Sequence, residues 1–374
     1  MAEVKKKVLI YWPFSELLNV HFYKDPCGIP IGFKENGYDS VLVVGKNKSN
    51  INLPFKIYES NLTNWRNVFY YYREFLKVIN IIYNERPEII IAYNRGPLLP
   101  LIVLSIRLRS LLTIKNRFRP KILLKMDSDG EFNNFRNALK IFIQAIITIN
   151  SKLFDFMMIE TQCGAKNIQK YILEKEKVIV IPNAHSIGPA MFSHKIINRR
   201  PIILSVARVS REKGIDVLIR AFSKISAIFP DWNLIVSGEV SDIPYYNELI
   251  KLISELGLSK RINLLGNVEW KELQKLYDVT SIFALMSFKE SFGIARIEAM
   301  AHGIPILTTP AGCGNDLSKY GAVIVPAGNI NETADALKRL VSDKDLREEI
   351  SKNQLDGVKT WSEVSRLIIR TCNL

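Results

Sequence analysis

The chain has 374 residues, of which 48% are hydrophobic and 24% are charged. This balance excludes an intrinsically disordered protein, and the length is greater than one ordinary core requires, so we expect two domains. Lys and Arg number 51 against 37 Asp and Glu, and the formal charge of +14 favours polyanionic partners such as nucleotide phosphates, nucleic acid or an anionic bilayer.

Strand and helix patterns alternate through the first half of the chain. Short apolar runs predict strands, and longer runs with apolar residues at helical spacing predict the helices between them. The predicted strands are residues 6–12, 39–45, 87–93, 121–126, 154–160 and 177–183, and the predicted helices are residues 64–84, 97–114 and 134–150.

The same alternation restarts near residue 200. The predicted strands are residues 200–208, 232–239, 262–266, 281–287, 304–309 and 322–326, with helices over 214–228 and 244–256. These strands are continuous apolar runs, which is typical of a parallel sheet covered by helices on both faces.

The sequence therefore predicts an α/β protein of two doubly wound, Rossmann-like domains. We place the first at 1–186, a hinge at 187–199 and the second at 200–358. A C-terminal helix over 359–374 is expected to pack back on the first domain. In such folds ligands bind at the carboxyl ends of the strands, so we expect the site in a central cleft that both sheets face.

Cysteine and histidine usage predicts neither disulfides nor a metal site. Cys27, Cys163, Cys313 and Cys372 stand far apart without paired spacing, which favours reduced thiols in a cytoplasmic protein. The four histidines lack the spacing of metal ligands. The first residues of the chain are basic but lack the apolar core of a signal peptide.

Segment 97–114 is the most apolar helix candidate. Arg107 and Arg109 interrupt it below the ~20 residues that a membrane span needs. It can be a buried core helix, or a helix that lies on a membrane interface with its arginines towards lipid phosphates. Basic residues follow it at Lys115, Arg117, Arg119 and Lys121. Segment 97–121 is therefore a candidate contact with an anionic membrane surface.

A basic turn follows the first strand of the second half, in "VARVSREKGIDVLIRAF" (206–222). Arg208 ends the strand, and Lys213 directly precedes Gly214, which opens an amphipathic helix. Arg offers a two-pronged fork and Lys a compact charge beside a helix start that already favours anions, which suits a diphosphate. The alternative interpretation is that both residues are solvated loop charges.

Two glutamates frame a strand–loop–helix segment, "FKESFGIARIEAMAHGIPILTT" (288–309). Glu290 is expected in the loop above the strand, and Glu298 about one turn inside the helix, which Gly303 ends. One nucleotide-sugar can then contact both acids, with Glu298 accepting hydrogen bonds from the ribose. Between them, backbone N–H groups available to phosphate oxygens belong to Ser291, Phe292, Gly293 and Ile294. The alternative is a capping acid and a solvated helix acid.

The order of these motifs resembles the nucleotide-binding half of the retaining, metal-independent glycosyltransferases of family four, which have the GT-B fold. The resemblance is carried by "SVARVSREKGIDVLIRAF", "NLIVSGE", "INLLGNVEWKELQKLY", "SFKESFGIARIEAMAHGIPILTTPAGCGNDL" and "GAVIVPAGN", and it is specific across 200–330. It implies transfer of a hexose-type sugar from a nucleotide-diphosphate sugar to an acceptor hydroxyl with retention, in the assembly of a glycan or a lipid-linked saccharide. Neither a metal nor a cofactor is implied.

The resemblance also implies roles for individual residues. Arg208 and Lys213 would bind the donor diphosphate and, with Glu290 near the reacting carbon of the sugar, form the catalytic set. Glu298 would bind the ribose. The residues beside the base would be Gly266 and Val268.

The first half departs from the family pattern. Where a histidine often ends a strand, this chain has "KMDSDG", which makes Asp127 and Asp129 candidates for acceptor contact. They can instead cap the next helix. An Asp-x-Asp pair can also hold a metal-bound nucleotide, but this pair lies outside the phosphate-binding half. The glycines after the first strand are displaced to Gly28 and Gly32, and Gly28 is a further acceptor-side candidate.

The sequence leaves three rival functions to consider. The first is another enzyme on the same fold, either a nucleotide-sugar epimerase or a sugar-phosphate synthase. The second is a non-catalytic protein that binds polyanions. The third is an inactive homologue that only binds or scaffolds, and the intact set of Arg208, Lys213, Glu290 and Glu298 argues against it. We expect no nucleic-acid partner, because the basic residues are scattered without the aromatic interleaving of a strand-binding platform.

Overall fold

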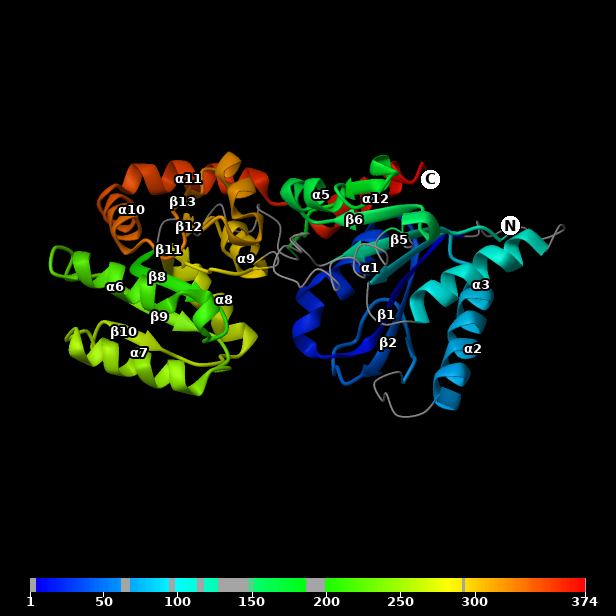
Figure 1. Cartoon of the computed structure of the whole chain (residues 1–374), viewed down its shortest axis with the longest axis horizontal. Helices are drawn as coiled ribbons and strands as arrows, with labels where there is room; N and C mark the ends of the chain where they lie inside the picture. Colours follow the sequence, from blue (N-terminus) through cyan, green and yellow to red (C-terminus); the bar gives the residue numbers. More distant parts are fainter. Residues whose placement is uncertain are drawn as a thin grey trace. The chain divides into compact units, whose positions relative to one another are not determined.

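A computed structural model describes residues 5–61, 68–93, 98–112, 118–126, 148, 151–185, 199–290 and 293–373. The chain divides into two compact units, one made of Met1–Ser186 with Lys359–Leu374 and the other of Ile187–Val358. Figure 1 shows the helices and strands of both units. Apart from Thr148 and Arg199, the predicted helix at 134–150 and the hinge at 187–199 lie outside the described residues.

The first unit contains a seven-stranded sheet in the order β3-β2-β1-β4-β5-β6-β7, and every neighbouring pair is parallel. The strands are β1 (Lys7–Leu17), β2 (Asp39–Asn47), β3 (Lys56–Glu59), β4 (Ile89–Tyr93), β5 (Lys121–Met126), β6 (Phe156–Ile159) and β7 (Val178–Val180). Six of them confirm predicted strands. β3 was missed because it is an edge strand of four residues with charged ends, which leaves almost no apolar run to recognise.

Helices cover both faces of this sheet. They are α1 (Asp25–Glu35), α2 (Val68–Glu85), α3 (Leu98–Leu112), α5 (Gln162–Ile168) and α12 (Trp361–Thr371). Alternate residues of β1 enter different cores: Leu9 packs with α2, α3 and α5, whereas Ile10 packs with α1 and α12. A strand buried on both faces must be apolar throughout, which explains the continuous runs in the sequence.

The C-terminal helix α12 packs against α1 within this unit. Gly28 and Gly32 lie one turn apart on α1, and a side chain at either position would overlap Trp361 of α12. Ser365 Oγ donates a hydrogen bond to the carbonyl of Ile29 at 3.3 Å across the same contact. Gly28 was predicted on the acceptor side; this close helix packing accounts for the glycine without an acceptor.

Helix α3 is apolar on both sides but buried on only one. Leu99, Ile102 and Ile106 lie in the core, whereas Leu101 and Leu108 are about half exposed, at 52% and 51%. The buried face fits the interpretation of segment 97–114 as a core helix, and its interpretation as a membrane-interface helix stays a prediction. In the part of the chain that the structure describes, no helix combines the length and apolar character needed to cross a membrane.

The arginines of α3 are engaged within the unit. Arg107 forms a 2.6 Å salt bridge with Asp155, and the Arg109 guanidinium lies over the Tyr83 ring at 4.4 Å. The expectation that these arginines point towards lipid phosphates is therefore wrong for Arg107, since a carboxylate of the same unit already pairs with its charge.

The second unit contains a six-stranded parallel sheet in the order β10-β9-β8-β11-β12-β13. Its strands are β8 (Arg200–Val206), β9 (Asn233–Ser237), β10 (Ile262–Leu264), β11 (Thr280–Leu285), β12 (Ile306–Thr308) and β13 (Val323–Ile324). Its helices are α6 (Ile215–Ser226), α7 (Ile243–Glu255), α8 (Trp270–Val279), α9 (Ile294–Ala301), α10 (Ile330–Ser342) and α11 (Lys344–Gly357). All six strands confirm predicted ones, with boundaries that shift by at most two residues.

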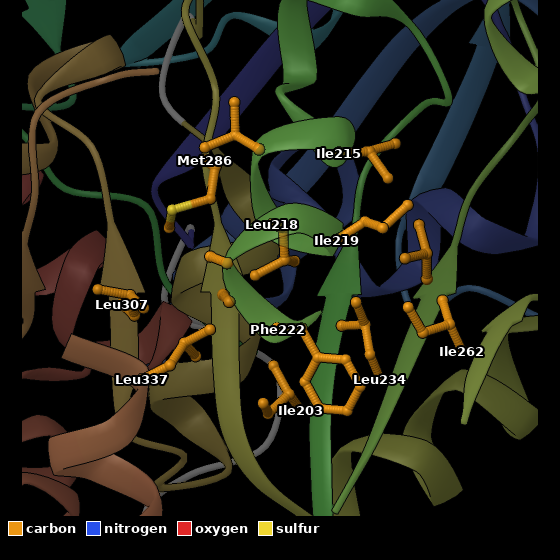
Figure 2. Packing of buried hydrophobic residues seen from close by; sticks show 14 of the residues in the cluster. Ile203, Ile215, Leu218, Ile219, Phe222, Leu234, Ile262, Met286, Leu307 and Leu337 are labelled. Atoms are coloured by element: carbon orange, nitrogen blue, oxygen red, sulfur yellow. The ribbon is translucent and has the colours of Figure 1, made fainter. Parts of the chain in front are cut away.

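Figure 2 shows the larger core of this unit, where Ile203, Leu234 and Ile262 of three neighbouring strands meet one face of α6. Phe222 and Leu218 supply that face. The next residue along β8, Leu204, enters a separate core on the opposite side of the sheet. Because all six strands are parallel, the loops after their carboxyl ends gather along one edge, where polar side chains can meet.

Glu85, the last residue of α2, ties the helix to two strands of the first unit. Its carboxylate accepts hydrogen bonds from Lys7 at 2.8 Å, Lys56 at 2.6 Å and Tyr58 at 2.5 Å. Burial by itself would raise the pKa of Glu85, but the hydrogen bonds from Lys56, Lys7 and Tyr58 outweigh burial and lower the pKa to about 2.

The Glu85 carboxylate should make the free energy of unfolding depend on pH. The folded-state pKa of Glu85 is near 2, below the ordinary 4.5. The carboxylate therefore stabilises the fold fully above about pH 4.5, and this stabilisation is lost as the pH falls towards 2. Urea unfolding of Glu85→Gln should give a lower free energy of unfolding than wild type at pH 6 and a smaller difference at pH 3. Glu88→Gln, which removes an exposed carboxylate 3.8 Å from Lys6, should leave the pH dependence unchanged. Parallel pH profiles for Glu85→Gln and wild type would contradict this account.

Candidate functional site

The loop between β8 and α6 buries a lysine. A short 3-10 turn, Arg211–Lys213, leads into Gly214, whose φ of 59° begins α6 in the left-handed region. This confirms the predicted helix start. A Cβ at Gly214 would collide with the main-chain carbonyl of Met286 at the end of β11, so only glycine lets the two loops approach this closely.

The loop after β11 is bonded directly to that turn. The amide of Phe288 donates to the carbonyl of Glu212 at 2.8 Å. Lys213 Nζ, on a side chain only 8% exposed, donates to the carbonyl of Lys289 at 3.2 Å and to Glu290 Oε2 at 2.8 Å. Two predicted site residues separated by 77 positions are thus in contact. A buried ammonium faces a carboxylate at the carboxyl edge of the sheet.

Arg208 lies at the exposed rim of the same loop. Its NH2 group contacts Glu212 Oε1 at 3.0 Å, and this same oxygen is 4.0 Å from Lys213 Nζ. Glu212 was not singled out in the sequence, yet its carboxylate stands between the two cations predicted to bind a diphosphate. The two positive groups are therefore close enough to share one oxyanion.

Helix α9 begins beside this ion pair. Gly293 precedes it with φ of 77°, and no side chain among the described residues caps its first turn. Its free N–H groups make this helix start favourable for an anion. The backbone N–H groups of Gly293 and Ile294 were among those predicted to face phosphate oxygens, and this role stays a prediction. The other two predicted residues, Ser291 and Phe292, lie outside the described residues. The predicted end of the helix is confirmed, because Gly303 follows it in the left-handed region with φ of 63°.

Glu298 lies in the second turn of α9 and is mostly buried. Its Oε2 accepts a hydrogen bond from the Tyr277 hydroxyl at 2.8 Å. Burial and the neighbouring Glu298 carboxylate raise the pKa of Tyr277 well above its usual value, so the phenol stays a donor. The ring of His302 stacks on Tyr277 at 5.0 Å. The carboxylate is therefore held in one orientation, and its contact with a ribose stays a prediction.

Arg296 is a site-building residue that the sequence analysis missed. Its guanidinium is 1% exposed and donates to the carbonyls of Ala311 at 3.1 Å and Gly312 at 3.2 Å, in the loop after β12. It also fills the space beside Gly293, and Gly312 in turn packs against Glu290. Arg296 thus ties the start of α9 to a third loop. The glycines of "PAGCG", directly after a predicted strand, were the available signal.

Gly266 and Val268 follow β10 at the same edge of the sheet. Gly266 has φ of 66°, and its carbonyl accepts a hydrogen bond from the amide of Gly238 at 2.8 Å. This places the predicted base-side turn two strands away from the loop of Lys213.

In the first unit, the acceptor-side candidates Asp127 and Asp129 lie outside the described residues. Two positions earlier, Lys125 is 3% exposed and contacts Asp25 at 3.0 Å and Glu160 at 2.8 Å. Lys125 and Glu160 lie at the carboxyl edge of that sheet, because Lys125 is the penultimate residue of β5 and Glu160 directly follows β6.

Two neutral groups complete this cluster. The Tyr93 hydroxyl donates to Asp25 at 2.8 Å, and Asn183 Nδ2 donates to Glu160 at 2.6 Å. A lysine inside the apolar run "KILLKM" was the signal that sequence reasoning overlooked, since an unpaired charge is rarely buried. Within the described ranges, no three His, Cys, Asp or Glu side chains are grouped as they would be to hold a metal ion.

Comparison with known proteins identifies the second unit. Residues 188–356 match the family model described as glycosyl transferases group 1. The second unit is a group 1 glycosyl transferase domain. Among curated relatives, alpha-D-kanosaminyltransferase from Streptomyces kanamyceticus is 30% identical over 159 residues, which cover 42% of this chain and 40% of that protein. Probable sucrose-phosphate synthase 1 from Oryza sativa subsp. indica is 31% identical over 178 residues, covering 44% of this chain and 16% of that one. The matches thus span less than half of either relative.

Similarity of structure extends over the whole chain. HepE from Anabaena, solved in complex with UDP and glucose, superposes with a TM-score of 0.70 over 99% of each chain at 15% sequence identity. At that identity the likeness shows the fold alone. The chain has the GT-B fold, which confirms the prediction of two doubly wound units, and its second unit carries the group 1 domain.

The contact at Gly214 gives a stability prediction. Gly214→Ala should lower the free energy of unfolding by about 2–4 kcal/mol, because it adds a clash with the Met286 carbonyl to a left-handed φ. Gly257→Ala is the matched control, since Gly257 has φ of 67° and nothing within 4 Å of an added Cβ, and should cost only about 1–2 kcal/mol. Chemical denaturation of both variants measures the difference; equal losses would show that the loops do not need this close approach.

Proposed function

We propose that the chain is a retaining glycosyltransferase that moves a hexose-type sugar from a nucleotide-diphosphate sugar to an acceptor hydroxyl without a metal ion. The observation that carries this proposal is the 2.8 Å contact between buried Lys213 and Glu290, at the carboxyl edge of a group 1 glycosyl transferase domain. The contact puts a fixed positive charge and a carboxylate together at the place where a donor binds in doubly wound sheets.

The chemical requirement of this reaction is to stabilise the charge of the leaving diphosphate. In the proposal, Lys213 and Arg208 contact the phosphate oxygens, and the start of α9 adds its backbone N–H groups. Glu212 Oε1, which both cations approach, marks a position for one such oxygen. Binding would then exchange a protein carboxylate for a phosphate. Fixed positive groups would do the work that a divalent ion does in metal-dependent transferases.

The two site glutamates take separate parts of the donor. Glu290, held by Lys213 and 3.4 Å from Ser287 Oγ, is assigned to the sugar near its reacting carbon. Glu298, whose carboxylate is oriented by Tyr277, is assigned to the ribose hydroxyls. Gly266 and Val268 are assigned to the base. The donor is thus laid along the sheet edge from the β10 loop to the β11 loop.

The anomeric configuration is retained when the acceptor attacks the anomeric carbon on the face from which the diphosphate leaves. The bond from the anomeric carbon to the phosphate oxygen breaks, and a bond from that carbon to the acceptor oxygen forms on the same side. The acceptor proton passes to the departing phosphate, so atoms and charges balance. No side chain needs to form a covalent bond to the sugar.

The acceptor is assigned to the first unit. The cluster around Lys125 and the adjoining candidates Asp127 and Asp129 offer the polar groups that hydroxyls of a saccharide need. The acceptor proposed is a glycan or a lipid-linked saccharide. Neither set of contacts selects a particular sugar.

Removing Lys213 tests the proposal. Lys213→Ala should lower the turnover rate by about 10²–10³-fold, because one preorganised charge on the leaving group is lost. Lys251→Ala, which removes a lysine that is 79% exposed on α7, should keep wild-type turnover. Circular dichroism and the melting temperature check that both variants are folded. Unchanged turnover in folded Lys213→Ala would overturn the assignment.

The same assay, run with different substrates, identifies the donor, tests for a metal requirement and tests the acceptor. UDP-, GDP- and ADP-sugars are compared with and without EDTA, beginning with UDP-glucose because HepE was solved with UDP and glucose. Full turnover in EDTA is expected. Product analysis with a saccharide or a sugar phosphate as acceptor, and with no acceptor, separates transfer from the sugar-phosphate synthase and epimerase alternatives.

We also propose that the first unit works at the cytoplasmic face of an anionic membrane. Leu101, Leu104 and Leu108 of α3 are 52%, 42% and 51% exposed, and their spacing puts them on one helix face. The neighbouring helix α2 exposes Tyr72 and Leu76 in the same way. Such an apolar surface on a chain with a charge of +14 suits a bilayer that carries negative lipid headgroups.

Liposome flotation tests the surface on α3. The triple variant Leu101→Ser, Leu104→Ser, Leu108→Ser should lose most binding to vesicles of phosphatidylcholine and phosphatidylglycerol, because it removes three leucines that would insert partly into the bilayer. Leu173→Ser is the control, since Leu173 is 85% exposed elsewhere in the same unit and should not matter. Equal flotation of the wild type and the triple variant, or no flotation of the wild type, would contradict the proposal. Neither result bears on donor binding.

A further inference from the structure

A polar cavity lies at the edge of the second unit's sheet opposite the candidate donor site. It has a volume of about 80 Å³, and its lining includes Arg199, Ser281, Pro305 and Arg347. Arg199 directly precedes β8, Ser281 is at the beginning of β11 and Pro305 directly precedes β12. The cavity is therefore at the amino ends of the same strands whose carboxyl ends lead to the candidate donor site. β11 has six residues, so the two edges are about 20 Å apart.

The Arg199 guanidinium is held only by neutral groups. It donates to the carbonyls of Thr280 at 2.7 Å, His302 at 2.6 Å and Gly303 at 2.8 Å. An arginine has five N–H groups, so these three bonds leave donors available. Within the described residues it forms no salt bridge with a carboxylate, and its charge is balanced only at longer range by Asp278.

Arg347 is also hydrogen-bonded only to main-chain carbonyls among the described residues, and the carboxylates of Asp343 and Glu348 act on its charge without a hydrogen bond. Its NH1 group donates to the carbonyls of Leu340 at 2.6 Å, Val341 at 2.9 Å and Asp343 at 3.3 Å. The guanidinium lies 5.4 Å from the centre of the Trp232 ring. Across the described ranges, neither its NH2 nor its Nε donates a hydrogen bond. One edge of a fixed, planar fork is therefore left for a ligand.

The two guanidiniums repel each other in a partly enclosed space. Burial and the nearby charge of Arg347 lower the pKa of Arg199 to about 10. Lys344 also lines the cavity, and Glu348, which lies 3.5 Å from Lys344, is the only acidic side chain in the lining. Three cations thus face one carboxylate. Unpaired charge of one sign is costly to hold out of water, and an anion between the guanidiniums would relieve that cost.

We propose that this cavity binds a small phosphate-like dianion, either free phosphate or the phosphoryl group of a small metabolite. Arg347 keeps Nε and NH2 for two-pronged hydrogen bonding to a tetrahedral oxyanion, and Arg199 adds a second buried positive charge with its remaining N–H donors. A volume of about 80 Å³ is several times what one water molecule needs, so one such group fits. The site is separate from the proposed donor site and does not depend on the proposed function.

The position of Arg199 connects this site to α9. The His302 and Gly303 carbonyls that it holds directly follow that helix, and Glu298 belongs to the helix itself. The bound anion would therefore sit behind the helix whose other end faces the candidate donor site.

Isothermal titration with inorganic phosphate, at ionic strength kept constant with NaCl, tests the proposal. Wild-type chain and Lys213→Gln should both bind one phosphate in this cavity, because Lys213 lies at the other edge of the sheet. Arg347→Gln should weaken binding about 10–100-fold, the equivalent of one charge-assisted hydrogen bond. Loss of binding in Lys213→Gln with full binding in Arg347→Gln would assign the phosphate to the donor site and overturn the proposal, as would absence of binding to the wild type.

A milder pair of variants guards against unfolding, since Arg347 also caps carbonyls at the end of α10. Lys344→Gln removes a cavity lysine that is 77% exposed, and Lys352→Gln removes an exposed lysine from the same helix outside the cavity. Lys344→Gln should weaken binding about 2–5-fold and Lys352→Gln should not. If Arg347→Gln is unfolded by circular dichroism, equal affinities in this pair overturn the proposal. Comparison of phosphate with glycerol 3-phosphate then distinguishes the free ion from a phosphoryl ester.

Discussion

The ion pair between Lys213 and Glu290 is the contact on which the candidate site depends. It joins the loop after β8 to the loop after β11, and the hydrogen bond from Phe288 to Glu212 fixes the same two loops through their main chains. A lysine that is 8% exposed needs a nearby acceptor for its charge, so the sheet edge cannot rearrange freely around it. An incoming phosphate would find this charge already desolvated and oriented, which is the condition for strong electrostatic stabilisation.

Glycine and arginine act together in building this edge. Gly214 permits the close approach of two loops, and Gly312 permits the third loop to pack against Glu290. Arg296, buried beneath them, satisfies main-chain carbonyls that would otherwise lose their hydrogen bonds to water. At the far end of α9 a second arginine, Arg199, does the same for the carbonyls of the helix end. One short helix is therefore held at both ends by guanidinium groups.

In the first unit, apolar cores cover the faces of the sheet and polar groups lie at its edges. Its sheet is covered on both faces, and α12 completes one face although it lies more than 300 residues after α1 in the chain. Polar groups are gathered at the carboxyl edge, where Lys125 is enclosed by two carboxylates, and at the amino edge, where Glu85 collects two lysines and a tyrosine. Both of these buried charges lie at an edge of the sheet, where side chains from several elements can converge on one group.

Local sequence patterns were enough to predict the framework: two doubly wound units, twelve of the thirteen strands in the described part of the chain, and the helix limits at Gly214 and Gly303. They could do so because a strand buried on both faces must be apolar throughout, and a residue with positive φ is most often glycine. Lys213 and Glu290 were each singled out from a local motif, but their contact with each other was not predicted. The partners of the other charges are known only from the folded chain: Arg107 pairs with Asp155, Arg296 supports a third loop, and two arginines line one cavity. Which charges meet depends on the order of the strands in the sheet, and local sequence patterns carry no record of that order.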